Sequence, residues 1–265
     1  MGSSFDPRRN YMSHPTKGAG SVFAILFAFA FTLHVYQNIK YRCWRLNWLT
    51  PCTAIIFLAG SISLEYSAFH PTDFSPSQGL FYSGSAVLVA AYCVYLVYLM
   101  ATQHELKRWW NQLIGTVFIF TLSGVISLTA QGTSNFFGTG ATPSSAHAGL
   151  QVLRAGVTVL LAANIVSLVV FVLFYRHIAL GLGREDIKRQ VKVWISVLWA
   201  IGILLLARNL FRTVQIFLPA SADLWTSEAY FWIFEAAIVF VCIMLLNLLP
   251  PVLISPARNV CTNSC

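Results

Sequence analysis

Residues 148–175 read AGLQVLRAGVTVLLAANIVSLVVFVLFY, an apolar run that contains a single charged residue, Arg154. A run of about 20 apolar residues crosses a bilayer as a helix, whereas membrane β-barrels give short alternating segments. The whole chain has the same character: 57% of its 265 residues are hydrophobic, 10% are charged, and the mean hydropathy is +0.68. Because soluble domains carry about 25% charged residues, the sequence predicts an all-α integral membrane protein.

Further apolar blocks of similar length lie on both sides of this run. Windows of about 19 residues place seven transmembrane helices, which predicts a seven-helix bundle over residues 20–250. A polar N-terminal segment, 1–19, precedes the bundle, and a short tail, 251–265, follows it. The predicted spans are 20–38, 49–69, 78–101, 113–131, 148–175, 193–217 and 228–249.

The basic residues indicate how the bundle sits in the membrane. Eleven Lys and Arg fall in the first, third and fifth loops and the tail, three precede the first span, and none lies in the other loops. Cytoplasmic loops carry the excess of Lys and Arg, so we expect a cytoplasmic C-terminus and an extracellular or lumenal N-terminus. The net charge of +8 is therefore attributed to topology and not to nucleic acid. The expected location is the plasma membrane or the endoplasmic reticulum.

Six charged residues fall inside the predicted spans or at their rims. A charge at the bilayer centre costs about 2.5–3.5 kcal/mol on insertion scales, so such residues are candidates for function. With a rise of about 1.5 Å per residue and the predicted orientation, all six lie in the outer half of the membrane. They are Glu65, Arg154, Arg208, Arg212, Glu228 and Glu235.

Helical spacing groups these charges on two helices. Arg208 and Arg212 are four residues apart and share a face, which Gln215 extends. On the last helix Glu228 and Glu235 are two turns apart, with Trp232 between them. We expect Arg208 and Arg212 to meet Glu235, and Glu65 to close the cluster from the second helix, because lipid offers polar side chains no partners.

The cluster has two interpretations. It is either an ion-paired network that holds the helices together, or an outward-opening pocket in which arginine binds an anionic head group through its planar fork of donors. The candidate ligand-binding residues are Arg208, Arg212, Gln215, Glu228, Trp232, Arg154 and Tyr66.

Other chemistries lack the residues they need. All five lysines lie outside the predicted spans, so a retinal Schiff base has no attachment point. No histidine pair has the spacing of a metal site such as H-E-x-x-H. We therefore expect no metal and no cofactor.

Several segments resemble the fungal RTA-like family, also called lipid-translocating exporters. The most specific are RNLFRTVQ at 208–215 and SEAYFWIFEA at 227–236; LEY at 64–66, GVISLTAQ at 124–131 and NLLPP at 247–251 add to them. The resemblance implies a seven-helix protein with an extracellular N-terminus that handles lipids and confers toxin or sterol stress resistance. It also implies that Glu65, Arg208, Arg212, Glu228 and Glu235 occupy polar positions of the family.

The chain departs from the family pattern at its polar positions. Gly124 stands where an Asp is usual, Gln215 replaces a Glu, Glu235 replaces an Asp, and Pro250 stands where a His-Pro pair is typical. These changes indicate a divergent member.

Two functions remain open at this point. The first is handling of an amphiphilic lipid, by translocation or sensing, through the polar pocket. The second is a membrane-bound terpene cyclase of a fungal meroterpenoid pathway that acts on a prenylated small molecule, with Glu65 or Glu235 as general acid and aromatic side chains around the cation. Because an adjacent cation favours the ionised carboxylate, a cyclase needs a glutamate away from the arginines, and Glu65 is the candidate.

Overall fold

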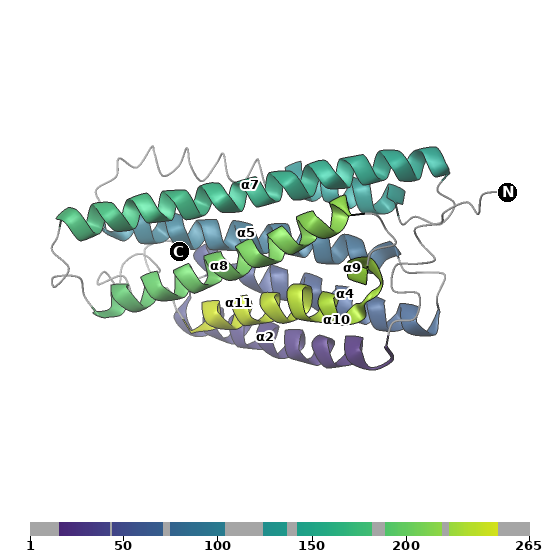
Figure 1. The fold of residues 1–265 in the computed structure, drawn as a ribbon. Helices are drawn as coiled ribbons and strands as arrows, with labels where there is room; N and C mark the ends of the chain where they lie inside the picture. Colours follow the sequence, from purple (N-terminus) through teal and green to yellow (C-terminus); the bar gives the residue numbers. More distant parts are fainter. Residues whose placement is uncertain are drawn as a thin grey trace.

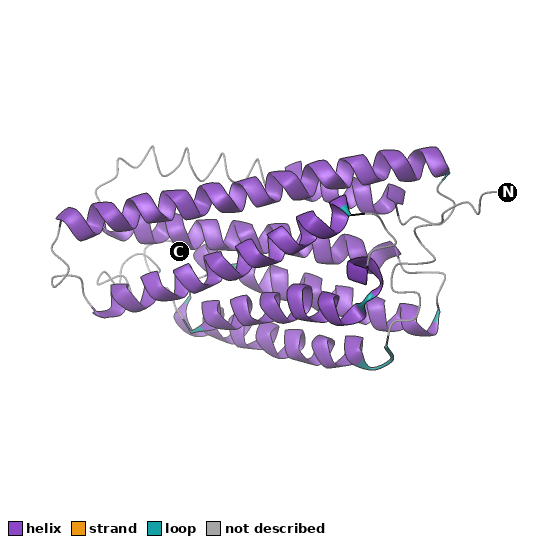
Figure 2. Cartoon of the chain, in the orientation of Figure 1, coloured by secondary structure: helices purple, strands orange, loops and turns teal. Residues whose placement is uncertain are grey.

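The fold is taken from a computed structural model, which describes residues 16–42, 44–70, 75–103, 124–136, 142–181, 189–218 and 223–248. Every regular element among these residues is helical (Figure 2). The elements are α2 (Ala19–Tyr41), α3 (Trp44–Asn47), α4 (Leu49–Phe69), α5 (Ser75–Gln103), α7 (Pro143–Gly181), α8 (Arg189–Phe217), α9 (Asp223–Thr226), α10 (Glu228–Phe231), the π-helix η1 (Trp232–Ala237) and α11 (Ile238–Asn247).

The predicted all-α membrane fold is confirmed. Within the described part of the chain, six helical segments are long and apolar enough to cross a membrane. Residues 124–136 are also helical and overlap the predicted span 113–131, whereas 104–123 lie outside the described residues. The six segments are Ala19–Tyr41, Leu49–Phe69, Ser77–Met100, Ser144–Arg176, Val191–Phe217 and Glu228–Asn247.

The fifth predicted span is longer than expected. The helix α7 has 39 residues, about 58 Å at 1.5 Å per residue, which exceeds the roughly 30 Å of a hydrocarbon core. At its start, the hydroxyl oxygen of Thr142 accepts the N–H of Ser145 over 3.3 Å, as an N-cap does. In Figure 1 this helix is the longest element and runs along one side of the bundle.

The seventh predicted span is interrupted. The segment that follows α10 is a π-helix of six residues, and regular α-helix resumes at Ile238. A π-turn is rare, and it changes the direction in which side chains leave the helix. The interruption contains Glu235, one of the predicted site residues.

The helix α5 lies at the centre of the bundle, between the pair α2 and α4 and the pair α7 and α8 (Figure 1). In its most apolar stretch 72% of the residues are buried, compared with 22% for α2. Aromatic rings from three helices pack in series through the core: the ring centres of Phe27 and Phe57 are 5.1 Å apart, and those of Phe57 and Phe81 are 5.4 Å apart in an edge-on arrangement.

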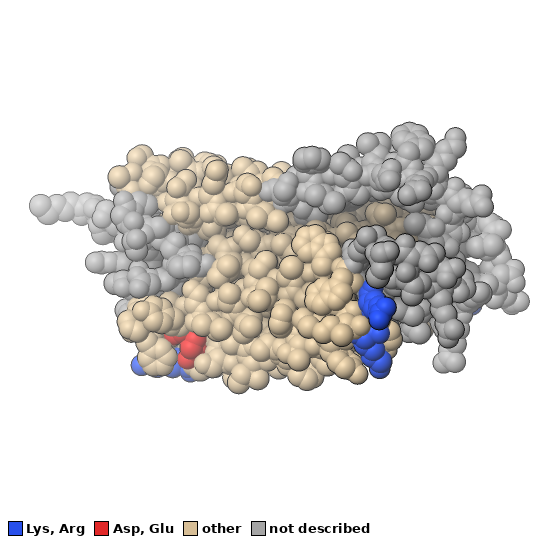
Figure 3. All heavy atoms as spheres, turned by 180° about the vertical axis from the view of Figure 1, so that it is seen from behind, with Lys and Arg blue, Asp and Glu red and all other residues tan. Residues whose placement is uncertain are grey.

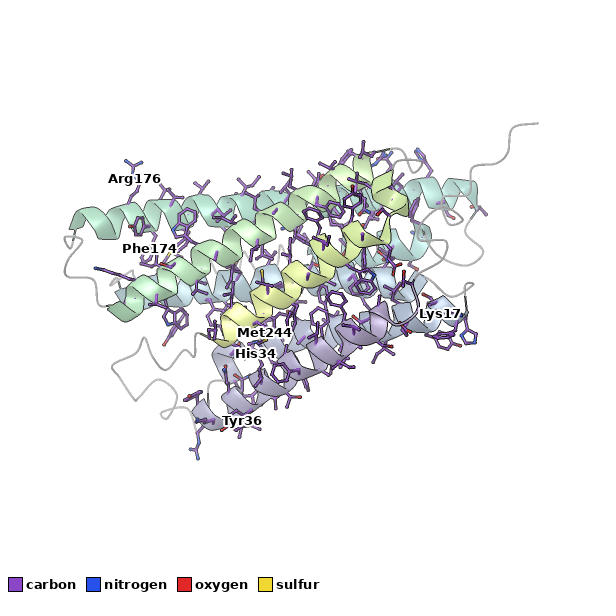
Figure 4. All side chains as sticks on the ribbon, turned by 60° about the horizontal axis from the view of Figure 1, so that its bottom comes forward. Lys17, His34, Tyr36, Phe174, Arg176 and Met244 are labelled. Carbon is purple, nitrogen blue, oxygen red and sulfur yellow. The ribbon has the colours of Figure 1, made fainter. Side chains whose placement is uncertain are left out.

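The surface matches a membrane-embedded bundle. On the face drawn in Figure 3, charged side chains gather near the two ends of the described part and leave an uncharged belt between them. Lys17 lies at one end of the bundle and Arg176 at the other (Figure 4). Most of the predicted N-terminal segment and the whole predicted tail, residues 1–15 and 249–265, lie outside the described residues. The orientation of the termini stays a prediction.

Candidate functional site

The centre of the candidate site is a triad of buried charges on two helices. Arg208 donates from Nε to Glu235 Oε2 over 2.9 Å and from Nη2 to Glu235 Oε1. Arg212 donates from Nε to the same Oε2 over 2.7 Å. The exposed fractions of the side chains are 1% for Arg208 and 0% for Arg212 and Glu235. The predicted meeting of both arginines with Glu235 is confirmed.

Neutral polar side chains add further hydrogen bonds around the triad. The hydroxyl of Ser85, on α5, lies 3.1 Å from Glu235 Oε1. Asn209 Oδ1 accepts from Arg208 Nη1 over 3.0 Å. Gln215 Oε1 accepts from Arg212 Nη1 over 2.8 Å, so the predicted place of Gln215 beside Arg212 is also confirmed. The triad therefore joins α5, α8 and η1.

Aromatic rings cover the guanidinium of Arg212. Its central carbon lies 4.7 Å from the ring centre of Tyr82 and 5.5 Å from that of Phe231. Such contacts stabilise a cation by about 0.5–2 kcal/mol. The Phe81 ring packs edge-on against Phe231 at 5.0 Å, which connects this end of the site to the aromatic core.

Glu65 does not belong to the triad, and the expectation that it closes the cluster is wrong. Its carboxylate accepts the backbone N–H of Gly18 over 2.9 Å at Oε1 and that of Ser21 over 3.2 Å at Oε2. The first N–H groups of a helix have no intrahelical partner and attract negative charge. Glu65 on α4 therefore caps the start of α2. The approach is close: a Cβ on Gly20 would lie 2.9 Å from Glu65 Oε2.

Arg154 has the opposite role at the end of α8. Its Nε donates to the backbone oxygen of Ile216 over 3.3 Å, and its guanidinium lies 5.3 Å from the ring centre of Phe217. The last carbonyl groups of a helix lack intrahelical donors and attract cations. Arg154 therefore joins α7 to the last turn of α8 and lies apart from the triad contacts.

Glu228 and Trp232 link the last span to the segment before α2. Glu228 Oε2 accepts the backbone N–H and the hydroxyl of Thr16 over 2.7 and 2.5 Å. Its Oε1 accepts the indole N–H of Trp232 over 2.7 Å, and the Trp232 ring stacks on Phe23 of α2 at 4.7 Å. This group faces the start of α2.

Tyr66 is exposed, and its ring stacks on His70 at 4.3 Å. The six predicted charges thus divide equally: three form the triad, and three bind at or near helix ends. Among the described residues, no group of three His, Cys, Asp or Glu side chains is arranged to hold a metal ion.

Sequence reasoning missed the contribution of α5. Tyr82 and Ser85 reach the triad, although neither is charged. A polar stripe on an otherwise apolar span was the available signal, because Gln78, Tyr82 and Ser85 follow the i, i+4, i+7 spacing of one helix face.

Comparisons with known proteins agree with this arrangement. The family model described as "RTA1 like protein" matches residues 77–258, which is well over half of the chain and includes Arg208, Arg212 and Glu235. The chain belongs to the RTA1-like family. The resemblance predicted from the motifs is therefore confirmed.

A curated member of the RTA1-like family gives a second comparison. The "Lipid-translocating exporter-like protein RTA1" of Leptosphaeria maculans is 26% identical over 271 aligned positions, which cover 91% of this chain and 50% of that protein. The chain thus spans about half the length of this curated relative. The identity of 26% fits a divergent member of the family.

Proposed function

We propose that this multi-pass membrane protein binds an amphiphilic lipid and moves it across the membrane, with the triad as the site for an anionic head group. The observation that carries the proposal is the complete burial of Arg208, Arg212 and Glu235 within apolar spans. Ionisable groups at such depth are costly, and they mark substrate pathways in transport proteins. The name of the curated relative, a lipid-translocating exporter-like protein, supports the same direction.

The geometry of the triad supports different tasks for the two arginines. Arg208 contacts both oxygens of Glu235 and also Asn209. A bidentate pair of this kind is geometrically fixed, so Arg208 positions Glu235. Arg212 shares a single oxygen of Glu235 through Nε and turns Nη1 toward Gln215. We assign the head group to Arg212, because its bond to Glu235 can be exchanged for a bond to a phosphate or carboxylate while Glu235 stays neutralised by Arg208.

The π-helix supplies a second argument. Glu235 lies in a six-residue π-turn, and π-turns occur frequently at functional sites. The same turn begins at Trp232, which donates to Glu228 and stacks on Phe23 of α2. A head group that displaces Glu235 from Arg212 would therefore act directly on the least regular part of the last span.

The cyclase hypothesis gains no supporting observation. The carboxylate of Glu65 accepts backbone N–H groups at the start of α2, and that of Glu235 accepts from two guanidiniums. Both carboxylates therefore serve as hydrogen-bond acceptors in the structure, whereas the cyclase reaction needs a carboxylic acid that donates a proton to the substrate.

The experiment is lipid translocation in proteoliposomes. Phosphatidylserine with a fluorescent acyl chain is placed in both leaflets, and bleaching of the outer leaflet by dithionite reports movement between them. We expect the wild-type protein to accelerate movement, and Arg212→Gln to slow it at least tenfold. Arg176→Gln is the matched control, because Arg176 projects away from the bundle (Figure 4).

The outcome separates transport from a purely structural triad. If Arg212→Gln translocates the lipid at the wild-type rate and merely unfolds at a lower temperature, the triad stabilises the bundle and the proposal is wrong.

A further inference from the structure

A second group of buried polar atoms lies away from the triad, where α5, α7 and α8 meet. Among the described residues, neither the two amide atoms of Asn164, on α7, nor the hydroxyl of Tyr92, on α5, have a hydrogen-bond partner. Both residues are at 0% exposure. They lie well inside the candidate spans Ser144–Arg176 and Ser77–Met100. Polar groups in the hydrocarbon region are costly unless they are hydrogen-bonded.

Two contacts define a seam between the three helices, which includes Tyr92. A Cβ on Gly202 of α8 would lie 2.6 Å from the Tyr92 hydroxyl and 2.6 Å from Leu168 Cδ2 of α7, so Tyr92 reaches across to the α7–α8 contact. The thiol of Cys93, next to Tyr92, lies 3.3 Å from the hydroxyl of Ser167. The seam is therefore defined by Tyr92 and Cys93 of α5, Ser167 and Leu168 of α7, and Gly202 of α8.

Asn164 faces this seam. It precedes Ser167 by three residues and Leu168 by four, and residues at these spacings share a helix face. The buried positions on α7 follow the same face, with Leu160, Asn164, Ser167 and Phe171 all at 1% exposure or less. An asparagine carries two donors and one acceptor oxygen, and on this face of α7 it lies on the side of the helix that Ser167 and Leu168 turn toward α5 and α8.

The seam also continues toward the triad. Asn209 is seven residues after Gly202, which returns it to the same face of α8. Its Oδ1 accepts from Arg208, whereas its Nδ2 has no partner in the described part of the chain, and the residue is 1% exposed. At a rise of about 1.5 Å per residue, Asn209 lies about 10 Å along α8 from Gly202. Unpartnered polar atoms thus occur at both ends of this stretch of the seam.

We propose that the α5–α7–α8 seam is a second polar site, separate from the triad, which binds a neutral hydroxyl group between Asn164 and Tyr92. A hydroxyl fits because it both donates and accepts, as an amide and a phenol require. The described side chains that define the seam are uncharged, so the seam offers an ion no counter-charge. The hydroxyl belongs either to bound water or to a lipid, and the experiment below distinguishes these two sources.

The first measurement uses Tyr92→Phe, which removes the hydroxyl and leaves the ring. If the hydroxyl is hydrogen-bonded to a bound group, the substitution lowers the apparent Tm by about 2–4 °C. If the hydroxyl makes no hydrogen bond in the apolar interior, its removal leaves the Tm unchanged or raises it. Tyr36→Phe is the matched control, because Tyr36 is 58% exposed.

The second measurement identifies the source. Radiolytic hydroxyl-radical footprinting modifies a buried side chain where water is held beside it. If the hydroxyl belongs to bound water, radicals formed there modify Tyr92 faster than Phe57, a fully buried ring among other rings. The substitution Asn164→Leu then abolishes this difference in rate. If the hydroxyl belongs to a lipid, monoolein raises the apparent Tm and its di-O-methyl ether does not. The substitution Asn164→Leu then removes the increase in Tm with monoolein.

Either pattern, together with a lower Tm for Tyr92→Phe, supports the site. The proposal is overturned if Tyr92→Phe is as stable as the wild type, Tyr92 is modified no faster than Phe57, and neither lipid shifts the Tm. These readouts do not involve translocation of phosphatidylserine, so failure here leaves the proposed role of the triad unaffected.

Discussion

Arg212 donates from Nε to Oε2 of Glu235 over 2.7 Å, and both side chains are fully buried. Arg208 binds the same carboxylate through both of its oxygens. One acidic side chain on the π-helix therefore binds two basic side chains of α8. Removing the glutamate leaves two buried cations without their carboxylate, whereas removing one arginine leaves the other arginine paired with Glu235.

Glu235→Gln is expected to be the most destabilising single change in the triad. It removes the carboxylate that both guanidiniums share, and breaking a buried ion pair costs about 3–5 kcal/mol. Arg212→Gln leaves Arg208 paired with Glu235, so its cost is smaller. Thermal unfolding of the two purified variants checks the order, and a Glu235→Gln protein as stable as Arg212→Gln would contradict it.

Gly20→Ala is expected to separate the start of α2 from α4. The new Cβ would lie 2.9 Å from Glu65 Oε2 and from the backbone oxygen of Ser61, which forces one helix to shift and costs about 1–3 kcal/mol. Gly124→Ala is the matched control, because its Cβ meets no atom of the described residues within 4 Å. Equal thermal stabilities for the two variants would show that Glu65 does not hold α2 closely.

Gly202→Ala tests the contact between α5 and α8. Its Cβ would lie 2.6 Å from the Tyr92 hydroxyl, and such overpacking costs about 1–3 kcal/mol. Part of this cost is relieved when Tyr92→Phe removes the hydroxyl, so the double variant is more stable than the sum of the single changes predicts. Additive free energies of unfolding in this cycle would refute the contact.

The predicted orientation is tested at the two ends of α2. Lys17→Cys should react with a membrane-impermeant maleimide in intact cells, whereas Lys40→Cys should react after permeabilisation, because the count of basic residues places the N-terminus outside. The wild-type protein gives the background from its own cysteines. The reverse pattern of labelling would show that the protein has the opposite orientation in the membrane.

The sequence predicted the six described spans and the pairing of Arg208 and Arg212 with Glu235. Apolar runs and the four-residue spacing of Arg208 and Arg212 follow directly from the residue types, and a buried carboxylate such as Glu235 is their natural partner. Glu65 was misplaced because its partners are the backbone N–H groups of Gly18 and Ser21, and backbone donors have no signature in sequence.

The contributions of α5 and of the π-helix were also not predicted. Ser85 and Tyr82 are neutral residues in an apolar span, so a prediction based on charged residues does not include them. The π-turn at Trp232–Ala237 depends on how the last span packs against its neighbours, and periodicity along one helix does not report this. Both features nonetheless determine where the carboxylate of Glu235 lies.

The most direct test of the central claim, that Arg212 holds an anionic head group, is the equilibrium affinity of the purified protein for phosphatidylserine and for phosphatidylcholine with the same acyl chains. The account predicts that the wild type and Arg176→Gln bind the anionic lipid at least tenfold more tightly, and that Arg212→Gln binds both lipids equally. An Arg212→Gln protein that keeps the full preference for phosphatidylserine would contradict it.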